Sequence, residues 1–222
     1  MATKFFILNL CLIGTFVFTG CKECESDEYG AELELVVPIE TTPLSETIRV
    51  GDTLWITANF DKEVMLKDRP LSIRLDDFNF FTEIGVSEIT DTSEHFSVEI
   101  ETIEDVGQIS FLTLQTALTY PVFYEEREDA YHFRGGIVFN QEGLFFVRLN
   151  TQPLLYESYE HPAMYQCGDK RRRSVRVCYA NASTNVENYE NIFLQTNVDY
   201  LLELMDYERY ASIGAFTLRV VP

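Results

Sequence analysis

Apolar and polar residues alternate along much of the chain. The clearest case follows Gly51 and Asp52, where residues 53–60 alternate, with Trp55 in the otherwise polar set, and bring four apolar side chains onto one face: Leu54, Ile56, Ala58 and Phe60. A period of two places alternate residues on opposite faces of a strand, so this segment predicts a half-buried strand. The same period, or a short apolar run, predicts further strands near residues 71–75, 97–101, 109–113, 137–139, 144–149, 175–179 and 216–220.

The period changes near the C-terminus, over residues 188–210. Apolar residues are here spaced at i, i+3, i+4 and i+7, at Val198, Leu201, Leu202 and Met205. This spacing predicts a helix with one apolar stripe, whole or broken, with Asn188 and Asn197 as candidate caps and Gly214 at its end. We interpret the stripe as a packing face rather than a groove for a partner.

Short strands at regular spacing, without long helices between them, are typical of an antiparallel β-sandwich. The sequence therefore predicts a mainly β fold, with the helical segment inserted before the last strand. Residues 31–222 are most simply one domain, although a sandwich of this length can also consist of two small modules.

The first twenty residues differ from the rest. Lys4 precedes a mostly apolar run over residues 5–18, which is shorter than the roughly 20 residues of a membrane span and suits a secretory signal peptide. Residues 21–30 follow as an acidic tether, with four acids among residues 22–28.

The junction at residues 18–21, Phe-Thr-Gly-Cys, resembles the lipobox of bacterial lipoproteins. This resemblance implies a lipid on Cys21 and a peripheral membrane protein with a water-facing body. The acids directly behind Cys21 resemble the surface-export signal of Bacteroidetes lipoproteins, which implies the outer face of the outer membrane. The alternative is a solvated spacer.

Three further segments carry a looser resemblance. Residues 50–56, 142–147 and 214–220 contain strand starts and turns that look like the immunoglobulin-like portion of Bacteroidetes outer-membrane lipoproteins. The resemblance implies an immunoglobulin-like sandwich and brings no catalytic residue with it.

The charge balance limits the partners. The chain has 36 acidic residues against 17 Lys and Arg, a formal net charge of -19, which argues against nucleic acid and anionic lipid as ligands. The sequence has no hydrolase serine elbow, phosphate loop or dinucleotide fingerprint, so we expect no enzyme and no cofactor. We expect no metal site either, because the histidines are far apart and the acidic segments 76–79 and 91–94 fit solvated turns better than a calcium loop.

Five cysteines are present, and two of them suit a disulfide. Cys167 and Cys178 have ten residues between them, in a loop or hairpin, and export to an oxidising compartment favours their pairing. The alternative is two separate thiols. Cys24, in the tether, is then the odd cysteine.

A basic loop lies between these two cysteines. It concentrates cationic residues in an acidic domain and has tyrosines nearby, a combination typical of binding surfaces. The candidate binding residues are Lys170, Arg171, Arg172, Arg173, Arg176, Tyr165 and Tyr179. The alternative is a solvated loop.

Two roles remain open from the sequence. The first is a noncatalytic, lipid-anchored module whose immunoglobulin-like body binds a glycan or a protein. The second is a structural accessory subunit of an outer-membrane protein complex, docked through the late helix or the basic loop.

Overall fold

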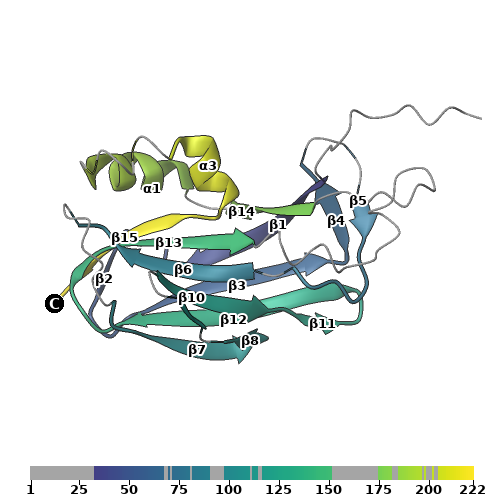
Figure 1. Cartoon of the computed structure of the whole chain (residues 1–222), viewed down its shortest axis with the longest axis horizontal. Helices are drawn as coiled ribbons and strands as arrows, with labels where there is room; N and C mark the ends of the chain where they lie inside the picture. The colour runs from purple at the N-terminus through teal and green to yellow at the C-terminus, as the bar shows by residue number, and fades with distance from the viewer. Residues whose placement is uncertain are drawn as a thin grey trace, which may run out of the picture.

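The protein forms two β-sheets packed face to face, with short helices on one outer face (Figure 1). The computed structural model describes residues 33–67, 70, 72–80, 82–90, 98–110, 112–114, 117–151, 175–181, 185–196, 198, 202 and 205–222. The mainly β sandwich with a helical segment before its last strand is therefore confirmed.

The first sheet runs in the order β11-β12-β3-β1-β4-β5, with β14 paired to β1 and β7 paired to β12. Its strands are β1 (Leu33–Thr42), β3 (Thr53–Asp61), β4 (Glu63–Leu66), β5 (Ser72–Arg74), β7 (Ile100–Val106), β11 (Glu125–Arg127), β12 (Ala130–Phe139) and β14 (Val175–Asn181).

The second sheet runs in the order β2-β15-β13-β6-β10-β8, with β9 paired to β10. Its strands are β2 (Thr47–Arg49), β6 (Thr82–Glu88), β8 (Gln108–Ile109), β9 (Leu112–Leu114), β10 (Ala117–Phe123), β13 (Gly143–Thr151) and β15 (Phe216–Val221).

Two strand pairs are parallel, so the sheets are mixed rather than purely antiparallel as expected. β1 pairs with β14, and β15 pairs with β2, in parallel register. Neither pair is consecutive in the chain, so no hairpin forces the antiparallel direction on it.

The strand predicted at residues 53–60 is confirmed as β3. Leu54, Ile56, Ala58 and Phe60 are all buried between the sheets, while the alternate residues lie on the outer face. Full burial of one such Leu or Ile side chain contributes about 1.5–3 kcal/mol to folding, which is why the alternation fixes the orientation of the strand.

Other segments differ from the prediction. β7 begins at Ile100 and runs to Val106, later than the predicted 97–101. An acidic run occupies residues 125–129. Only Glu128 and Asp129 form the turn, since Glu125–Arg127 is the strand β11 that pairs with β12.

The helical segment is broken, as the sequence allowed, into α1 (Asn185–Asn191), η3 (Phe193–Thr196) and α3 (Tyr207–Ser212). Val198 and Met205 are buried, and Leu202 is partly buried, in a second apolar cluster with Phe146 of β13. The packing interpretation of the stripe is therefore confirmed for these three residues, while Leu201 lies outside the described residues.

The predicted cap at Asn188 is wrong. Asn188 lies inside α1 with its side chain 1% exposed, and its amide bonds β15 instead of a helix end. The other candidate cap, Asn197, lies outside the described residues. Gly214 does end α3, at a φ of 55° that favours glycine.

Candidate functional site

Most of the residues singled out from the sequence lie outside the described residues. These are Cys21, Tyr165, Cys167, Lys170, Arg171, Arg172 and Arg173. Arg176 is placed by its backbone in β14, opposite Glu34 of β1. The basic loop therefore stays a prediction.

Tyr179 is not the exposed aromatic residue that the sequence suggested. Its side chain is 3% exposed, and its hydroxyl lies 2.6 Å from Oγ1 of Thr82 on the second sheet. The reason is the alternation of β14, which turns Val177 and Tyr179 into the core between the sheets. Cys178, between them, is also buried. Its pairing with Cys167 stays a prediction.

The open face of the first sheet carries a different candidate site. Trp55, in the outward register of β3, is directly opposite Gly136 of β12, and Gly136 is opposite Ile103 of β7. Trp55 is partly exposed, and Ile103 is among the exposed large apolar residues. We call this row of Trp55, Gly136 and Ile103 the Trp55 surface.

Gly136 holds the indole close to the sheet. A Cβ atom at this position would lie 2.6 Å from Cγ2 of Thr53 and 3.2 Å from Cζ3 of Trp55, both closer than van der Waals contact allows. The ring of Trp55 therefore leans over β12 only because residue 136 has no side chain. Gly136 itself is buried, so the partly exposed indole and the exposed Ile103 form the accessible part of the Trp55 surface.

Arg134, on the same strand β12 as Gly136, positions the indole of Trp55. Its guanidinium carbon lies 4.1 Å from the centroid of the Trp55 ring, and its Nη1 forms an ion pair with Oδ2 of Asp105 at the end of β7. A cation over an aromatic ring is attracted to the negative face of the π system. The position of the Trp55 side chain on β3 thereby depends on contacts from β12 and β7 as well.

The sequence contains part of this signal. The alternation of residues 53–60 places Trp55, the only tryptophan of the chain, on the outer face. Arg134, Gly136 and Ile103 could not be joined to it from the sequence, because strand pairing alone brings them together.

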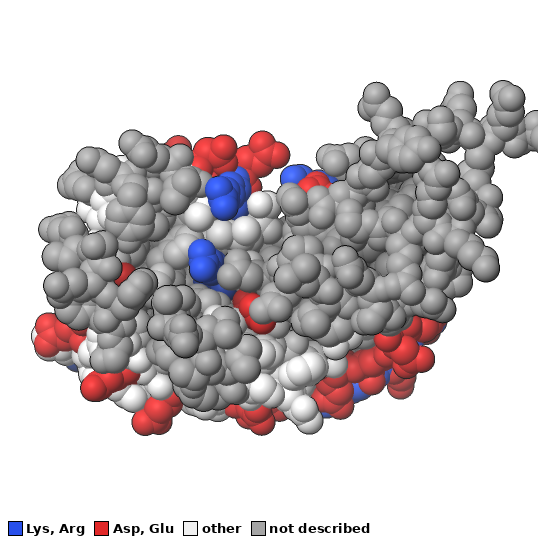
Figure 2. Space-filling view, viewed as in Figure 1, with Lys and Arg blue, Asp and Glu red and all other residues white. Residues whose placement is uncertain are grey.

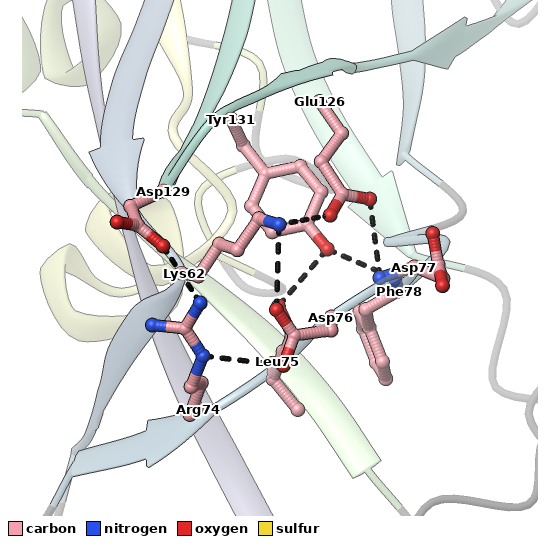
Figure 3. Close-up of polar contacts among 9 residues, drawn as sticks. All are labelled: Lys62, Arg74, Leu75, Asp76, Asp77, Phe78, Glu126, Asp129 and Tyr131. Atoms are coloured by element: carbon pink, nitrogen blue, oxygen red, sulfur yellow. Dashed lines mark hydrogen bonds and ion pairs between the residues drawn. The ribbon is translucent and has the colours of Figure 1, made fainter.

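A cluster of ion pairs lies where β3 turns into β4, close to β5 and the β11–β12 hairpin (Figure 3). The ammonium of Lys62, a residue that is only 8% exposed, contacts the carboxylates of Asp76, at 3.3 Å, and Glu126. Arg74 contacts Asp76 at 3.2 Å and Asp129 at 2.7 Å. Two cations thus hold three carboxylates.

The charges in this cluster stabilise one another. The hydrogen bond to Glu126 raises the pKa of Lys62 despite its desolvation. Desolvation acts to raise the pKa of Asp76, but hydrogen bonds from Arg74 and Lys62 outweigh it and lower that pKa. Carboxylates kept ionised in this way are poor proton donors, so we interpret the cluster as a clamp between chain segments.

Tyr131 joins the same clamp from inside the core. Its hydroxyl accepts a hydrogen bond from the backbone N–H of Phe78 at 2.9 Å and donates one to the carbonyl of Leu75 at 3.1 Å. Asp76 and Asp77, which the sequence offered as oxygen ligands, lie in the segment that Tyr131 fixes. Within the described ranges, no group of three or more His, Cys, Asp or Glu residues could hold a metal ion.

No model of a protein family matches the chain, and no curated protein matches it. In the part of the chain that the structure describes, every helix is too short or too polar to cross a bilayer. The Trp55 surface and the N-terminal pattern are therefore the observations from which a function is argued.

Proposed function

We propose that the protein is a noncatalytic binding module, held at the outer membrane by a lipid on Cys21, and that its Trp55 surface binds a neutral glycan. The observation that carries the binding proposal is the partly exposed indole of Trp55, fixed by Arg134 on an open sheet face. A ligand that stacks there meets a ring that is already ordered, which lowers the entropy cost of binding.

The chemistry around the indole suits a sugar. An aromatic face takes the C–H groups of a pyranose ring, while neighbouring polar side chains take its hydroxyl groups. Asn59 and Asp105 supply an amide and a carboxylate at the margins of the Trp55 surface, on β3 and β7. Ile103 extends the apolar contact beyond Gly136.

The charge of the surface argues for a neutral ligand. Glu101, Glu104 and Asp105 are exposed on β7, and Glu40 is exposed on β1, beside Thr57 of β3. Arg134 is paired with Asp105 and so does not offset the other three carboxylates, which would repel an anionic glycan.

The accessory-subunit role has less support. A docking helix would need a free apolar stripe, but Val198 and Met205 are buried in the cluster that contains Phe146 of β13.

The binding proposal is tested with the full chain on an array of neutral and anionic glycans. Because the chain has one tryptophan, quenching of its fluorescence reports directly on the Trp55 surface. We expect Trp55→Ala to weaken the binding of the selected glycan at least tenfold. Met65→Ala, which removes an exposed apolar side chain on β4, is the matched control and should bind normally. Equal binding by Trp55→Ala, or no binding of any neutral glycan on the array, would contradict the proposal.

The anchor is tested separately. Cys21→Ser should abolish palmitate labelling and move the protein out of the membrane fraction, whereas Cys24→Ser should leave both unchanged. Membrane retention of the unlabelled Cys21→Ser protein would overturn the lipid anchor but would leave the glycan proposal standing. Protease shaving of intact cells then tests whether the body faces outward.

A further inference from the structure

The first sheet has one long strand with an open side, β7. It pairs with β12 on one side, and no strand in the described part of the chain pairs with the other. The remaining edge strands that the structure describes are two or three residues long: β2, β5, β8, β9 and β11. The exception is β14, which is covered where Ile213, at the end of α3, forms a bridge with Tyr179. Figure 1 draws β7 as the outermost strand along the lower rim of the molecule.

The open side of β7 presents unused backbone groups. The N–H of Asn140 donates to the carbonyl of Glu99 at 2.9 Å. Residues that bond the neighbouring strand alternate with residues that do not along an antiparallel ladder. Counted on from Glu99, the N–H and C=O groups of Ile100 and Thr102 therefore point away from β12. Within the described ranges, these outward groups have no hydrogen-bond partner in the protein. An edge of this kind is a template for an added strand.

The side chains along this edge are acidic. Four exposed carboxylates belong to it: Glu99, Glu101, Glu104 and Asp105. Of these four, only Asp105 forms an ion pair with a described residue, Arg134. In the same view as Figure 1, Figure 2 shows acidic atoms along the lower rim of the molecule. Three carboxylates at the edge are thus left for a cation from outside the described part of the chain.

These charges argue against a second copy of the chain as the occupant. Antiparallel pairing of two β7 edges would bring carboxylates together in each register centred on the strand. It would place Glu101 opposite itself, Glu101 opposite Asp105, or Glu99 opposite Asp105. Like charges directly opposite each other destabilise a strand pair, whereas opposite charges stabilise it. The edge therefore suits a strand that carries Lys or Arg.

We propose that β7 is a docking edge for a cationic, extended segment of a partner protein, which adds to the first sheet as a further strand. The backbone of the segment bonds the outward groups of Ile100 and Thr102, and its Lys or Arg side chains contact the carboxylates of β7. In strand addition, main-chain hydrogen bonds supply affinity and side chains supply specificity. The proposal does not rest on glycan binding, because it uses the backbone of β7 rather than the indole of Trp55.

The experiment is calorimetric titration of the full chain with a short peptide of alternating Lys and Val residues. We expect saturable binding, and no binding of the same peptide with Glu in place of Lys. Proline is tolerated on an edge strand where the N–H faces solvent, so Thr102→Pro should fold and lose only an outward donor. Its Kd should rise at least about tenfold, because the ring also blocks the approach of a partner strand. Thr102→Ala, which keeps the N–H, is the matched control and should bind normally.

Hydrogen exchange locates the contact and decides the question even if Thr102→Pro fails to fold. In the free protein the amide of Thr102 should exchange faster than that of Ile103, because Ile103 bonds β12 and Thr102 does not. The bound peptide should slow exchange at Thr102. Failure of the Lys peptide to bind, equal binding of the Glu peptide, undiminished binding by folded Thr102→Pro, or unchanged exchange at Thr102 in the complex would each overturn the proposal.

Discussion

The guanidinium of Arg134 stacks on the indole of Trp55, with 4.1 Å between the guanidinium carbon and the ring centroid. Arg134 belongs to β12 and Trp55 to β3, and Asp105 of β7 holds the guanidinium from the other side. The guanidinium of Arg134 thereby links β3, β12 and β7 and fixes the indole of Trp55, the only tryptophan of the chain. The order of the indole, rather than its exposure alone, distinguishes this surface from a scattered apolar side chain.

Arg134→Ala should loosen the indole with a small effect on stability. We expect a loss of about 0.5–1 kcal/mol in the free energy of unfolding, because the stacked pair is partly exposed and its ion pair is screened by water. The native fluorescence of Trp55 should shift to longer wavelength, since water gains access to the ring. Urea titration and emission spectra measure the two effects, with Arg49→Ala on β2 as the control. An unchanged spectrum would show that Arg134 does not position the ring.

Tyr131→Phe should be much more damaging than the loss of one oxygen suggests. The change leaves the backbone N–H of Phe78 and the carbonyl of Leu75 without their partner in the core. An unsatisfied buried group costs about 1–3 kcal/mol, so we expect a loss in that range in urea unfolding. Tyr207→Phe, at a tyrosine that is 40% exposed, should change stability by less than about 0.5 kcal/mol. Equal effects of the two changes would refute the clamp.

Asn188 should be the most sensitive residue of the helical segment. Its amide donates to the carbonyl of Thr217 at 2.7 Å, and its oxygen accepts from the N–H of Thr217 at 2.7 Å and from the hydroxyl of Tyr210 at 2.6 Å. Asn188→Ala should cost at least about 2 kcal/mol, because it leaves buried polar groups on β15 and α3 unpaired.

The matched variant is Asn188→Asp, which keeps the shape of the side chain. It places an oxygen against the carbonyl of Thr217, so we expect it to be no more stable than Asn188→Ala at neutral pH. Thermal unfolding compares the two. Wild-type stability in Asn188→Asp would show that the amide donor is dispensable.

The sequence predicted those strands that have one face in the core and one in water. β3 is the clearest case. Its outward residues are polar except for Trp55, and all its inward residues, Ala58 included, are apolar. β6 escaped prediction for the opposite reason: residues 82–86 are buried one after another, so no alternation is left to detect.

The candidate sites were harder to predict from the sequence than the strands. Arg134 and Gly136 meet Trp55 through the register of β12 on β3, and Lys62 meets Glu126 across distant segments. Such pairings follow from sheet topology, which a single sequence does not specify. Asn188 shows the same limit, because a residue typical of helix caps was instead recruited by β15.

Stability should fall at both extremes of pH, for separate reasons that single variants can isolate. Asp76 and Asp129 have lowered pKa values in the folded state, Asp129 chiefly through its hydrogen bond with Arg74. The unfolded state therefore binds protons first, so their contribution is present above about pH 4 and is lost as the pH falls through the lower folded values.

At alkaline pH, desolvation raises the pKa of Tyr124 to about 12. Its contribution is present below about pH 10 and is lost as the pH rises towards that value. Urea unfolding measured across the pH range should show both slopes. Asp76→Asn should flatten chiefly the acid slope, because Asp76 is a lesser cause of the raised pKa of Lys62, and Tyr124→Phe should flatten only the alkaline slope. A variant that left its own slope unchanged would show that other groups control stability at that end of the range.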